Sequence, residues 1–395
     1  MKYKFLFSLL FSLILGGMVA TQAVADDYAC QVNTLIGTKG TGLTSGYLYP
    51  GATYPYGMVQ FTPSYFSKRS GFVINQLSGG GCEHMGNFPT FPVKGKLKMS
   101  PDNILNYRIN ISEEKGHAGY YEAMVQEDIK AKLTVTERTG MASYEYPADQ
   151  QYGTIIIGGG ISATPIEQAA IVITAPNKCE GYAEGGNFCG LRTPYKVYFV
   201  AEFDTDALET GTWKREELMP NTTFAEGGYS GVYFTFDVNK KKNIQYKIGV
   251  SYVSVENARK NLKAENTEWD FQKIQNQAEA KWNHYLGMIE VEGTNPDRTT
   301  QFYTHLYRSF IHPNVCSDVN GEYMGADFRV HKSRSKHYTS FSNWDTYRTQ
   351  IQLLSMLDPE VASDIVISHQ LFAEQSGGSF PRWVMANIET GVMQG

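Results

Sequence analysis

The sequence predicts an N-terminal antiparallel β-sandwich followed by the first helices of a helical barrel. Up to about residue 256, short β-branched and aromatic runs recur between Gly, Asn and Pro clusters with no helical period. Near residue 257 the apolar period becomes that of amphipathic helices. A mature chain of about 370 residues also exceeds what one hydrophobic core accommodates, so at least two domains are expected.

Residues 1–25 have the pattern of a cleavable signal peptide. Lys2 and Lys4 precede an apolar run, and small residues end at Ala25, directly before an acidic pair. The run is shorter than the ~20 residues that a membrane span needs. We therefore expect cleavage after Ala25, export to the periplasm or the medium, and no membrane insertion of the mature chain.

The sandwich is expected over residues 26–256. Residues 132–138 alternate between apolar and polar side chains, as a half-buried strand does. Similar runs lie at 153–157, 196–203, 231–237 and 245–252. Many strands at regular spacing indicate a large antiparallel sandwich.

Residues 257–293 are expected to form a helical linker. Its apolar residues recur at helical spacing on one face, namely Phe271, Ile274, Ala278, Trp282 and Tyr285.

Residues 294–395 are expected to begin a helical domain. A helix starting at Asn295-Pro296 has the apolar stripe Phe302, Leu306 and Phe310. Two more helices are predicted, one from about Asp345 to Leu357 and one from Pro359 to Gly377, the latter with an apolar face of Val361, Ile365 and Phe372. These helices cannot close a core by themselves, so the barrel is expected to be incomplete.

Charge argues against nucleic acid as a partner. The formal net charge is -5, with 35 Lys and Arg residues, and the longest basic run is residues 240–242.

Five cysteines in an exported chain predict disulfides, with one cysteine left over. Cys179 and Cys189 enclose a glycine-rich segment with little strand or helix character, so we expect a local disulfide between them. Cys30, Cys82 and Cys316 stay unassigned.

Five stretches between Val32 and Gly395 resemble, in this order, glycoside hydrolase family 92, the calcium-dependent exo-acting α-mannosidases. They are Val-Asn-Thr-Leu-Ile-Gly-Thr at 32–38 with residues 49–63, Leu-Ser-Gly-Gly-Gly-Cys-Glu-His-Met-Gly-Asn-Phe-Pro at 77–89, residues 118–121 with 133–140, residues 302–310 with 318–325, and Trp-Asp-Thr-Tyr-Arg at 344–348 with Pro381 and Glu389-Thr390.

The resemblance implies a β-sandwich paired with an (α/α)6 barrel and an active site between them. It also implies inverting, calcium-dependent hydrolysis of terminal α-linked mannose from glycans, with α-1,2 as the expected linkage. The acid, the base and the calcium ligands of the family lie on helices beyond the counterpart of Gly395. No catalytic or metal-binding residue is therefore assigned in this chain, which we expect to be truncated and inactive.

The resemblance places Asp345 where the family contacts the terminal mannose, and Trp344 beside it is a further candidate for substrate binding. A carboxylate that accepts from two sugar hydroxyls fixes the orientation of the sugar, although Asp345 could instead cap the helix that it opens. Trp344 could be a stacking platform or a core residue.

From the sandwich, the resemblance brings the loop Gly81-Cys82-Glu83-His84 to the leaving-group side of the pocket. The segment Glu-His-Met-Gly-Asn departs from the commoner Pro-Asp-Tyr-Gly-Asp, which leaves linkage preference open, and His84 could also be an ordinary surface histidine. Glu389 is not in the position of the family's acid, so we interpret it as part of the pocket wall or as a residue behind it.

Two other readings stay open. One is a non-catalytic carbohydrate-binding or surface protein, which would bind glycans without cleaving them. The other is a different hydrolase or phosphorylase with the same two-domain layout.

Overall fold

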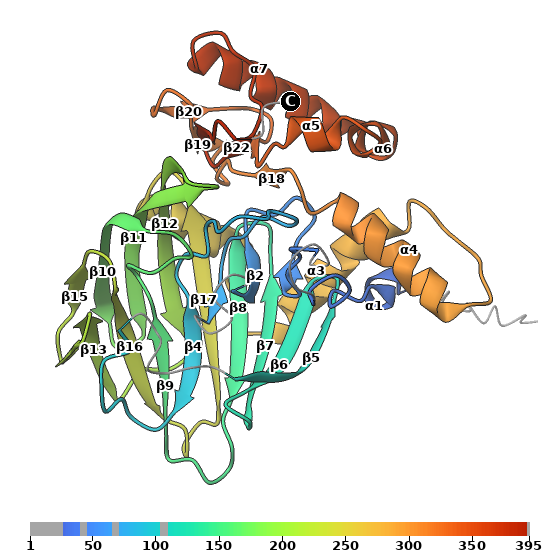
Figure 1. Ribbon diagram of the computed structural model, residues 1–395. Coiled ribbons are helices and arrows are strands. Elements are labelled where there is room, and N and C mark those ends of the chain that lie inside the picture. Colours follow the sequence, from blue (N-terminus) through green and yellow to red (C-terminus); the bar gives the residue numbers. More distant parts are fainter. Residues whose placement is uncertain (1–26, 40–45, 65–70, 103–109, 393–395) are drawn as a thin grey trace, which may run out of the picture.

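The computed structural model describes residues 27–39, 46–64, 71–102 and 110–392. The signal peptide proposed to end at Ala25 lies outside the described residues. Figure 1 shows a large β-sandwich, with helices and small two-stranded ladders covering one of its ends. No helix in the described part of the chain is long and apolar enough to cross a membrane.

The sandwich consists of two antiparallel sheets, which confirms the predicted N-terminal fold. The eight-stranded sheet has the order β1 (Ala52–Thr53), β2 (Gln60–Pro63), β3 (Phe72–Val73), β4 (Thr90–Lys94), β9 (Tyr152–Ile157), β16 (Ser230–Asp237), β13 (Glu209–Lys214) and β14 (Glu217–Pro220). The nine-stranded sheet has the order β15 (Phe224–Glu226), β10 (Ile166–Ala175), β11 (Lys178–Phe188), β12 (Leu191–Phe203), β17 (Asn243–Ser251), β8 (Thr139–Glu145), β7 (Ile129–Val135), β6 (Tyr120–Val125) and β5 (Ile111–His117).

The core of the sandwich lies between these two sheets. In β7 the side chains of Ile129, Ala131 and Leu133 are buried, while those of Lys130 and Lys132 are partly exposed, as a period of two requires. Across the core, the ring of Phe203 on β12 lies 4.8 Å from that of Phe234 on β16, which joins the two sheets.

The linker region forms two helices, α2 (Val255–Glu265) and α3 (Phe271–Leu286). In α2, Ala258 and Leu262 pack against Val200 of β12, so this helix covers part of the nine-stranded sheet. In α3 all five residues of the predicted apolar face are buried, which confirms that prediction.

Helix α4 (Pro296–Ser309) begins where the sequence predicts. The Asn295 side chain caps it by accepting from the backbone N–H groups of Asp297 and Arg298. Its buried stripe is shifted, however, because Phe302 is only half buried and the buried side chains are Tyr303, Thr304, Leu306 and Tyr307, followed by Phe310.

The single helix predicted from Asp345 to Leu357 is wrong in its bounds. The segment forms a short helix α5 (Asn343–Thr346) and a separate helix α6 (Gln350–Leu357). Between them Thr349 has φ +65°, which interrupts the right-handed helix. Asp345 therefore lies inside α5 and is not its N-cap.

Helix α7 (Pro359–Gln375) follows directly, capped by the side chain of Asp358, which accepts from Val361 N–H. Ile365 and Phe372 are buried as predicted, whereas Val361 is half buried. The described helices do not close into a barrel (Figure 1), as expected from the pattern.

Three two-stranded ladders and a short N-terminal helix complete the described structure. They are β18 (Asn314–Val315) with β21 (Tyr338–Thr339), β19 (Glu322–Met324) with β20 (Val330–Lys332), β22 (Val384–Met385) with β23 (Ile388–Glu389), and α1 (Tyr28–Gln31). The segment around α1 is fixed to α3 and α4, because Asn283 accepts from Ala29 N–H at 2.7 Å and Thr304 accepts from Asn33 N–H at 3.0 Å.

A buried ion cluster joins the sandwich to the helical part. The Arg138 guanidinium contacts Glu137 and Glu265 at 2.5 and 2.7 Å and donates to the Ser317 carbonyl at 2.7 Å. Lys336 also contacts Glu137. Burial alone would raise the pKa of Glu137, but Arg138 and Lys336 beside it hold that pKa below its usual range.

Candidate functional site

The loop 77–84 is held in shape by His84. The His84 ring is 1% exposed; its Nε2 accepts from Leu77 N–H at 2.8 Å, and its Nδ1 lies 2.7 Å from the Cys82 carbonyl. Burial lowers the pKa of His84 to about 4, so the ring is neutral at pH 7 with its proton on Nδ1. His84 thus holds the loop from inside, and the exposed residues of the loop are Gly79, Gly81 and Glu83.

The disulfide prediction was wrong. Cys189 is bonded to Cys82, not to Cys179. The glycine-rich segment between Cys179 and Cys189 is the strand β11, which spans eleven residues and keeps its two ends roughly 30 Å apart. Cys179 is buried in the sandwich core, and the Cys82–Cys189 bond ties loop 77–84 to the turn between β11 and β12.

Phe188, beside this disulfide, connects the loop to the C-terminal part of the chain. Its ring meets that of His84 edge-on at 5.9 Å and stacks on that of Trp383 at 4.5 Å. Trp383 directly precedes β22, so the sandwich loop and the β22–β23 hairpin meet at this point.

A histidine that the sequence analysis did not select also holds the loop. His312 Nε2 accepts from Ser78 N–H at 2.8 Å, and its Nδ1 lies 2.7 Å from Asn314 Oδ1. Burial lowers the pKa of His312 to about 4. No local pattern connects His312 with a loop more than two hundred positions earlier, so only the fold could reveal this contact.

Trp344 and Asp345 lie at the surface on α5. Trp344 is 40% exposed, which excludes a core role, and Asp345 is also exposed. The Ser342 hydroxyl donates to the Asp345 carboxylate, and the Ser342 backbone pairs with that of Trp383. The fold therefore places α5 directly against the hairpin that reaches the sandwich loop.

A hollow of about 460 Å³ opens beside Trp344. Its lining residues are Asn343, Trp344, Tyr347, Pro381 and Arg382. Aromatic walls with a few polar groups, in a hollow of this size, are typical of small-ligand sites. Asp345 follows Trp344 in α5 and is exposed, but it is not among the residues that line this hollow.

Glu389 shapes the hairpin. Its carboxylate accepts from the backbone N–H groups of Arg382 at 2.8 Å, Trp383 at 3.4 Å and Gly391 at 3.2 Å. Because these donors occupy the carboxylate, Glu389 holds Arg382 and Pro381 in the wall of the hollow.

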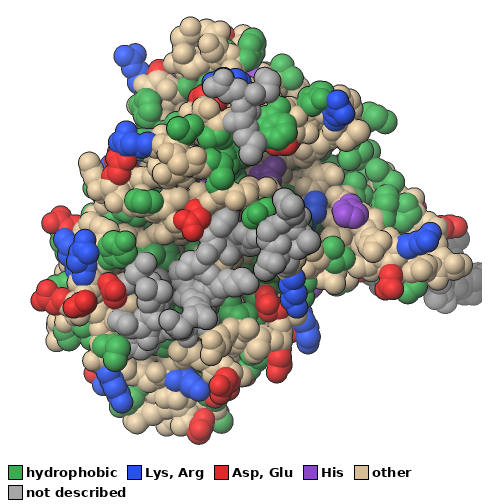
Figure 2. All heavy atoms as spheres, in the orientation of Figure 1, with side chains coloured by type: hydrophobic (Ala, Val, Ile, Leu, Met, Phe, Trp, Pro, Cys, Tyr) green, Lys and Arg blue, Asp and Glu red, His purple; other side chains and the backbone are tan. Residues whose placement is uncertain are grey.

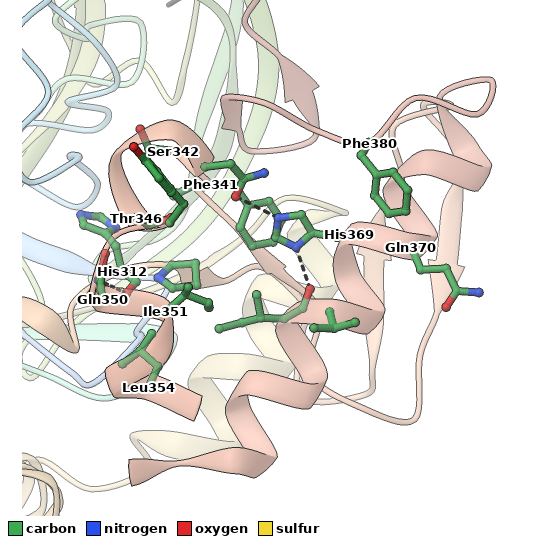
Figure 3. Close-up of a pocket in the computed structure, with 16 residues that line it drawn as sticks. His312, Phe341, Ser342, Thr346, Gln350, Ile351, Leu354, His369, Gln370 and Phe380 are labelled. Atoms are coloured by element: carbon green, nitrogen blue, oxygen red, sulfur yellow. Dashed lines mark hydrogen bonds between the residues drawn. The ribbon is translucent and has the colours of Figure 1, made fainter. Parts of the chain in front are cut away.

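Figure 3 shows a second hollow, of about 590 Å³, between α5–α6 and α7. Aliphatic and aromatic side chains dominate its walls, among them Ile351, Leu354 and Phe380. Among its polar residues, His369 contacts the Ile365 carbonyl at 2.8 Å and Asn343 Oδ1 at 3.1 Å, which leaves the apolar side chains as the main surface offered to a ligand. This hollow is therefore less suited to a polyhydroxylated ligand than the one beside Trp344.

The described residues contain no cluster of side chains that could bind the expected calcium ion. Nowhere in residues 27–392, leaving aside the segments not described, do three His, Cys, Asp or Glu side chains gather closely enough to hold a metal ion. No described residue is therefore assigned to calcium, and no step is derived through it.

The chain thus pairs an antiparallel β-sandwich with the first helices of a second domain, and the hollow beside Trp344 lies in that second domain. Residues 31–251 match the glycosyl hydrolase family 92 N-terminal domain, and residues 257–395 match the glycosyl hydrolase family 92 catalytic domain. The chain therefore belongs to glycosyl hydrolase family 92.

Solved relatives are similar along nearly the whole chain. A family GH92 α-mannosidase from Bacteroides thetaiotaomicron is 26% identical with a TM-score of 0.84, and the match covers 93% of this chain and 52% of that one. A second GH92 protein from the same organism, described as an inverting mannosidase, is 26% identical with a TM-score of 0.81, over 90% and 50% of the two chains.

An uncharacterized secreted glycosidase from Arthroderma benhamiae is 27% identical over 384 residues, which is 86% of this chain and 48% of that protein. The chain thus spans about half the length of the relatives that it matches.

Proposed function

We propose that this chain belongs to a hydrolase that removes terminal α-linked mannose from glycans, with α-1,2-linked mannose as the expected substrate. Family membership over both domains carries this proposal. It is supported by solved α-mannosidases of the same fold, one of which was determined in complex with mannoimidazole. The α-1,2 linkage rests on the sequence resemblance alone.

The terminal mannose is proposed to bind in the hollow beside Trp344. The exposed indole offers an apolar face, the Asp345 carboxylate can accept from sugar hydroxyls, and Arg382 can donate to them. Gly81 and Glu83, on the loop fixed by the disulfide and by His84, are proposed to face the leaving group.

An inverting mechanism needs one carboxylic acid at the leaving oxygen and one carboxylate at the attacking water, roughly 6.5–9.5 Å apart. Glu389 is not proposed for either role, because backbone N–H groups occupy its carboxylate. The acid, the base and the calcium ligands are proposed to belong to helices that this 395-residue chain does not include, and the chain alone is proposed not to turn over.

A second candidate is a non-catalytic carbohydrate-binding protein. It is supported by the hollow beside Trp344, which offers a binding surface, and by Glu389, whose carboxylate is occupied by backbone N–H groups. The two candidates make the same prediction for binding. They differ in whether a longer chain cleaves the sugar and in whether this chain associates in solution.

Export is also proposed, to the periplasm or the medium. Support comes from the signal-like pattern ending at Ala25, from the Cys82–Cys189 disulfide, which is typical of oxidising compartments, and from the secreted glycosidase among the relatives.

The proposal is tested by incubating the chain with α-1,2-mannobiose and calcium while recording ligand binding and free mannose by NMR. We expect saturation transfer to the non-reducing mannose without mannose release. Absence of any binding would contradict the proposed site, and calcium-dependent mannose release would contradict the proposed inactivity of the chain.

A further inference from the structure

A polar hollow of about 800 Å³ lies away from the Trp344 site, between α3, residues 334–338 and the start of α7. Its floor includes the rings of Tyr285 and Tyr338, which are almost fully buried. Charged side chains of both signs form its walls, namely Lys281, Arg334, Lys336, Asp358, Glu360 and Asp364.

A smaller hollow of about 300 Å³ continues the first one toward the sandwich. Both are lined by Lys281 and Lys336, so they share a wall. The smaller hollow adds Glu137 and Glu265 of the buried ion cluster together with the ring of Tyr54. The two hollows therefore lie next to each other along α3, and we call the pair the α3 groove.

Hydrogen bonds fix the polar groups of the α3 groove in place. The Tyr285 hydroxyl donates to Asp358 Oδ2 at 2.7 Å, and the Lys336 backbone N–H donates to Asp364 Oδ2 at 3.2 Å. The Lys336 ammonium contacts Glu137, which the Arg138 guanidinium also holds. Preorganised groups of this kind lower the ordering cost of binding a ligand.

The balance of charge selects among possible ligands. The α3 groove has five carboxylates, on Glu137, Glu265, Asp358, Glu360 and Asp364. Its cations are Lys281, Arg334 and Lys336, together with Arg138, which pairs with Glu137 and Glu265. The charges nearly balance with a slight excess of negative charge, so the groove does not attract a polyanion. A neutral polyhydroxylated chain could instead donate to the carboxylates and accept from the ammonium and guanidinium groups.

We propose that the α3 groove binds a neutral oligosaccharide, as a second glycan-binding site separate from the one beside Trp344. This inference rests on the proposed function, because it takes the ligand to be a glycan. Two adjacent hollows of about 800 and 300 Å³ offer room for more than one sugar unit, whereas the hollow of about 460 Å³ beside Trp344 suits a terminal one.

The test isolates the groove by removing the other site. Saturation-transfer NMR titrations with α-mannotetraose compare three forms of the full chain: wild type, Trp344→Ala, and Trp344→Ala combined with Lys281→Met and Asp364→Asn. Lys281 and Asp364 are partly exposed side chains, and thermal unfolding of each variant checks that it is folded. Dextran sulfate serves as the polyanionic comparison.

We expect Trp344→Ala to retain binding and the combined variant to lose at least about tenfold in affinity, since hydrogen bonds to charged groups are lost. The α3 groove is overturned if Trp344→Ala alone abolishes binding, a result that would leave the proposed active site standing. It is also overturned if the combined variant binds as Trp344→Ala does, or if dextran sulfate binds more tightly than mannotetraose. Equal binding by wild type and Trp344→Ala, with loss in the combined variant, would support the groove and count against the Trp344 site.

Discussion

His84 of the sandwich and His312 of the helical part accept hydrogen bonds from consecutive backbone N–H groups, those of Leu77 and Ser78, each at 2.8 Å. The loop next to the candidate site is therefore held from both domains at once. Both rings are buried, and burial lowers the pKa of each to about 4.

Acid should loosen this junction. In the unfolded chain a histidine takes up a proton near pH 6.5, whereas these two rings stay neutral down to about pH 4 in the folded state. Between these two pH values the unfolded state binds more protons than the folded state, so protonation favours unfolding. Each histidine therefore makes its full contribution to the free energy of unfolding above about pH 6.5. That contribution is lost as the pH falls toward 4, by up to roughly 3 kcal/mol per histidine.

Urea unfolding at pH 7.5 and pH 5 measures this loss. The variant His312→Gln, whose amide can still accept from Ser78 N–H, should show a smaller difference between the two pH values. The same substitution at the exposed His284 serves as the control and should leave the difference unchanged. If the wild type has the same free energy of unfolding at both pH values, then His84 and His312 are not buried neutral acceptors at this junction.

The sequence was sufficient to predict those helices whose bounds and buried faces depend on neighbouring residues in the chain. The apolar face of α3 and the start of α4 at Asn295-Pro296 follow from periodicity and capping. The break at Thr349 was missed because a left-handed residue in the middle of an apolar helical pattern leaves no periodic signal. The pairing of Cys82 with Cys189 depends on sheet topology, which spacing along the chain cannot give.

The disulfide makes a second prediction. Peptide mapping without reduction should join the peptide of Cys82 to that of Cys189, and Cys179 should react with an alkylating agent only after unfolding, because it is buried. Breaking the bond with Cys189→Ser should lower the free energy of unfolding by about 2–4 kcal/mol. Cys30→Ser, at an exposed cysteine, is the matched control and should have little effect. Recovery of a Cys179–Cys189 peptide would show that the pairing is wrong.

The ion cluster at the domain junction makes a third prediction. Arg138→Met leaves the carboxylate of Glu265 without its cation and that of Glu137 with Lys336 alone, which should cost about 3–5 kcal/mol of unfolding free energy. Arg192→Met removes the exposed pair with Glu167 and should cost less than about 1 kcal/mol. Similar losses in the two variants would refute the idea that the Arg138 cluster joins the domains.

The helices α6 and α7 expose apolar side chains that should promote association. Met356 of α6 is 79% exposed and Val366 of α7 66%, and Phe380, after the end of α7, is 67% exposed. In Figure 2 hydrophobic side chains are visible in the upper part of the molecule, where Figure 1 places these helices. Sedimentation velocity should show concentration-dependent association that Met356→Lys with Val366→Lys reduces. The matched change Leu208→Lys, at a 55% exposed sandwich residue, should leave association unchanged. A monodisperse wild type would speak against this view and for a free-standing binding protein.

The affinity of the chain for α-1,2-mannobiose in the variants Trp344→Ala and Asp345→Asn decides whether the sugar binds beside α5. Both side chains are exposed, so the fold should be unaffected and any change reports on the sugar contact. If the terminal mannose contacts these side chains, each variant should weaken binding at least about fivefold. Trp344→Ala removes an aromatic contact, and Asp345→Asn removes a hydrogen bond to a charged group. Unchanged affinity in both variants would contradict the claim that a terminal mannose binds between α5 and the β22–β23 hairpin.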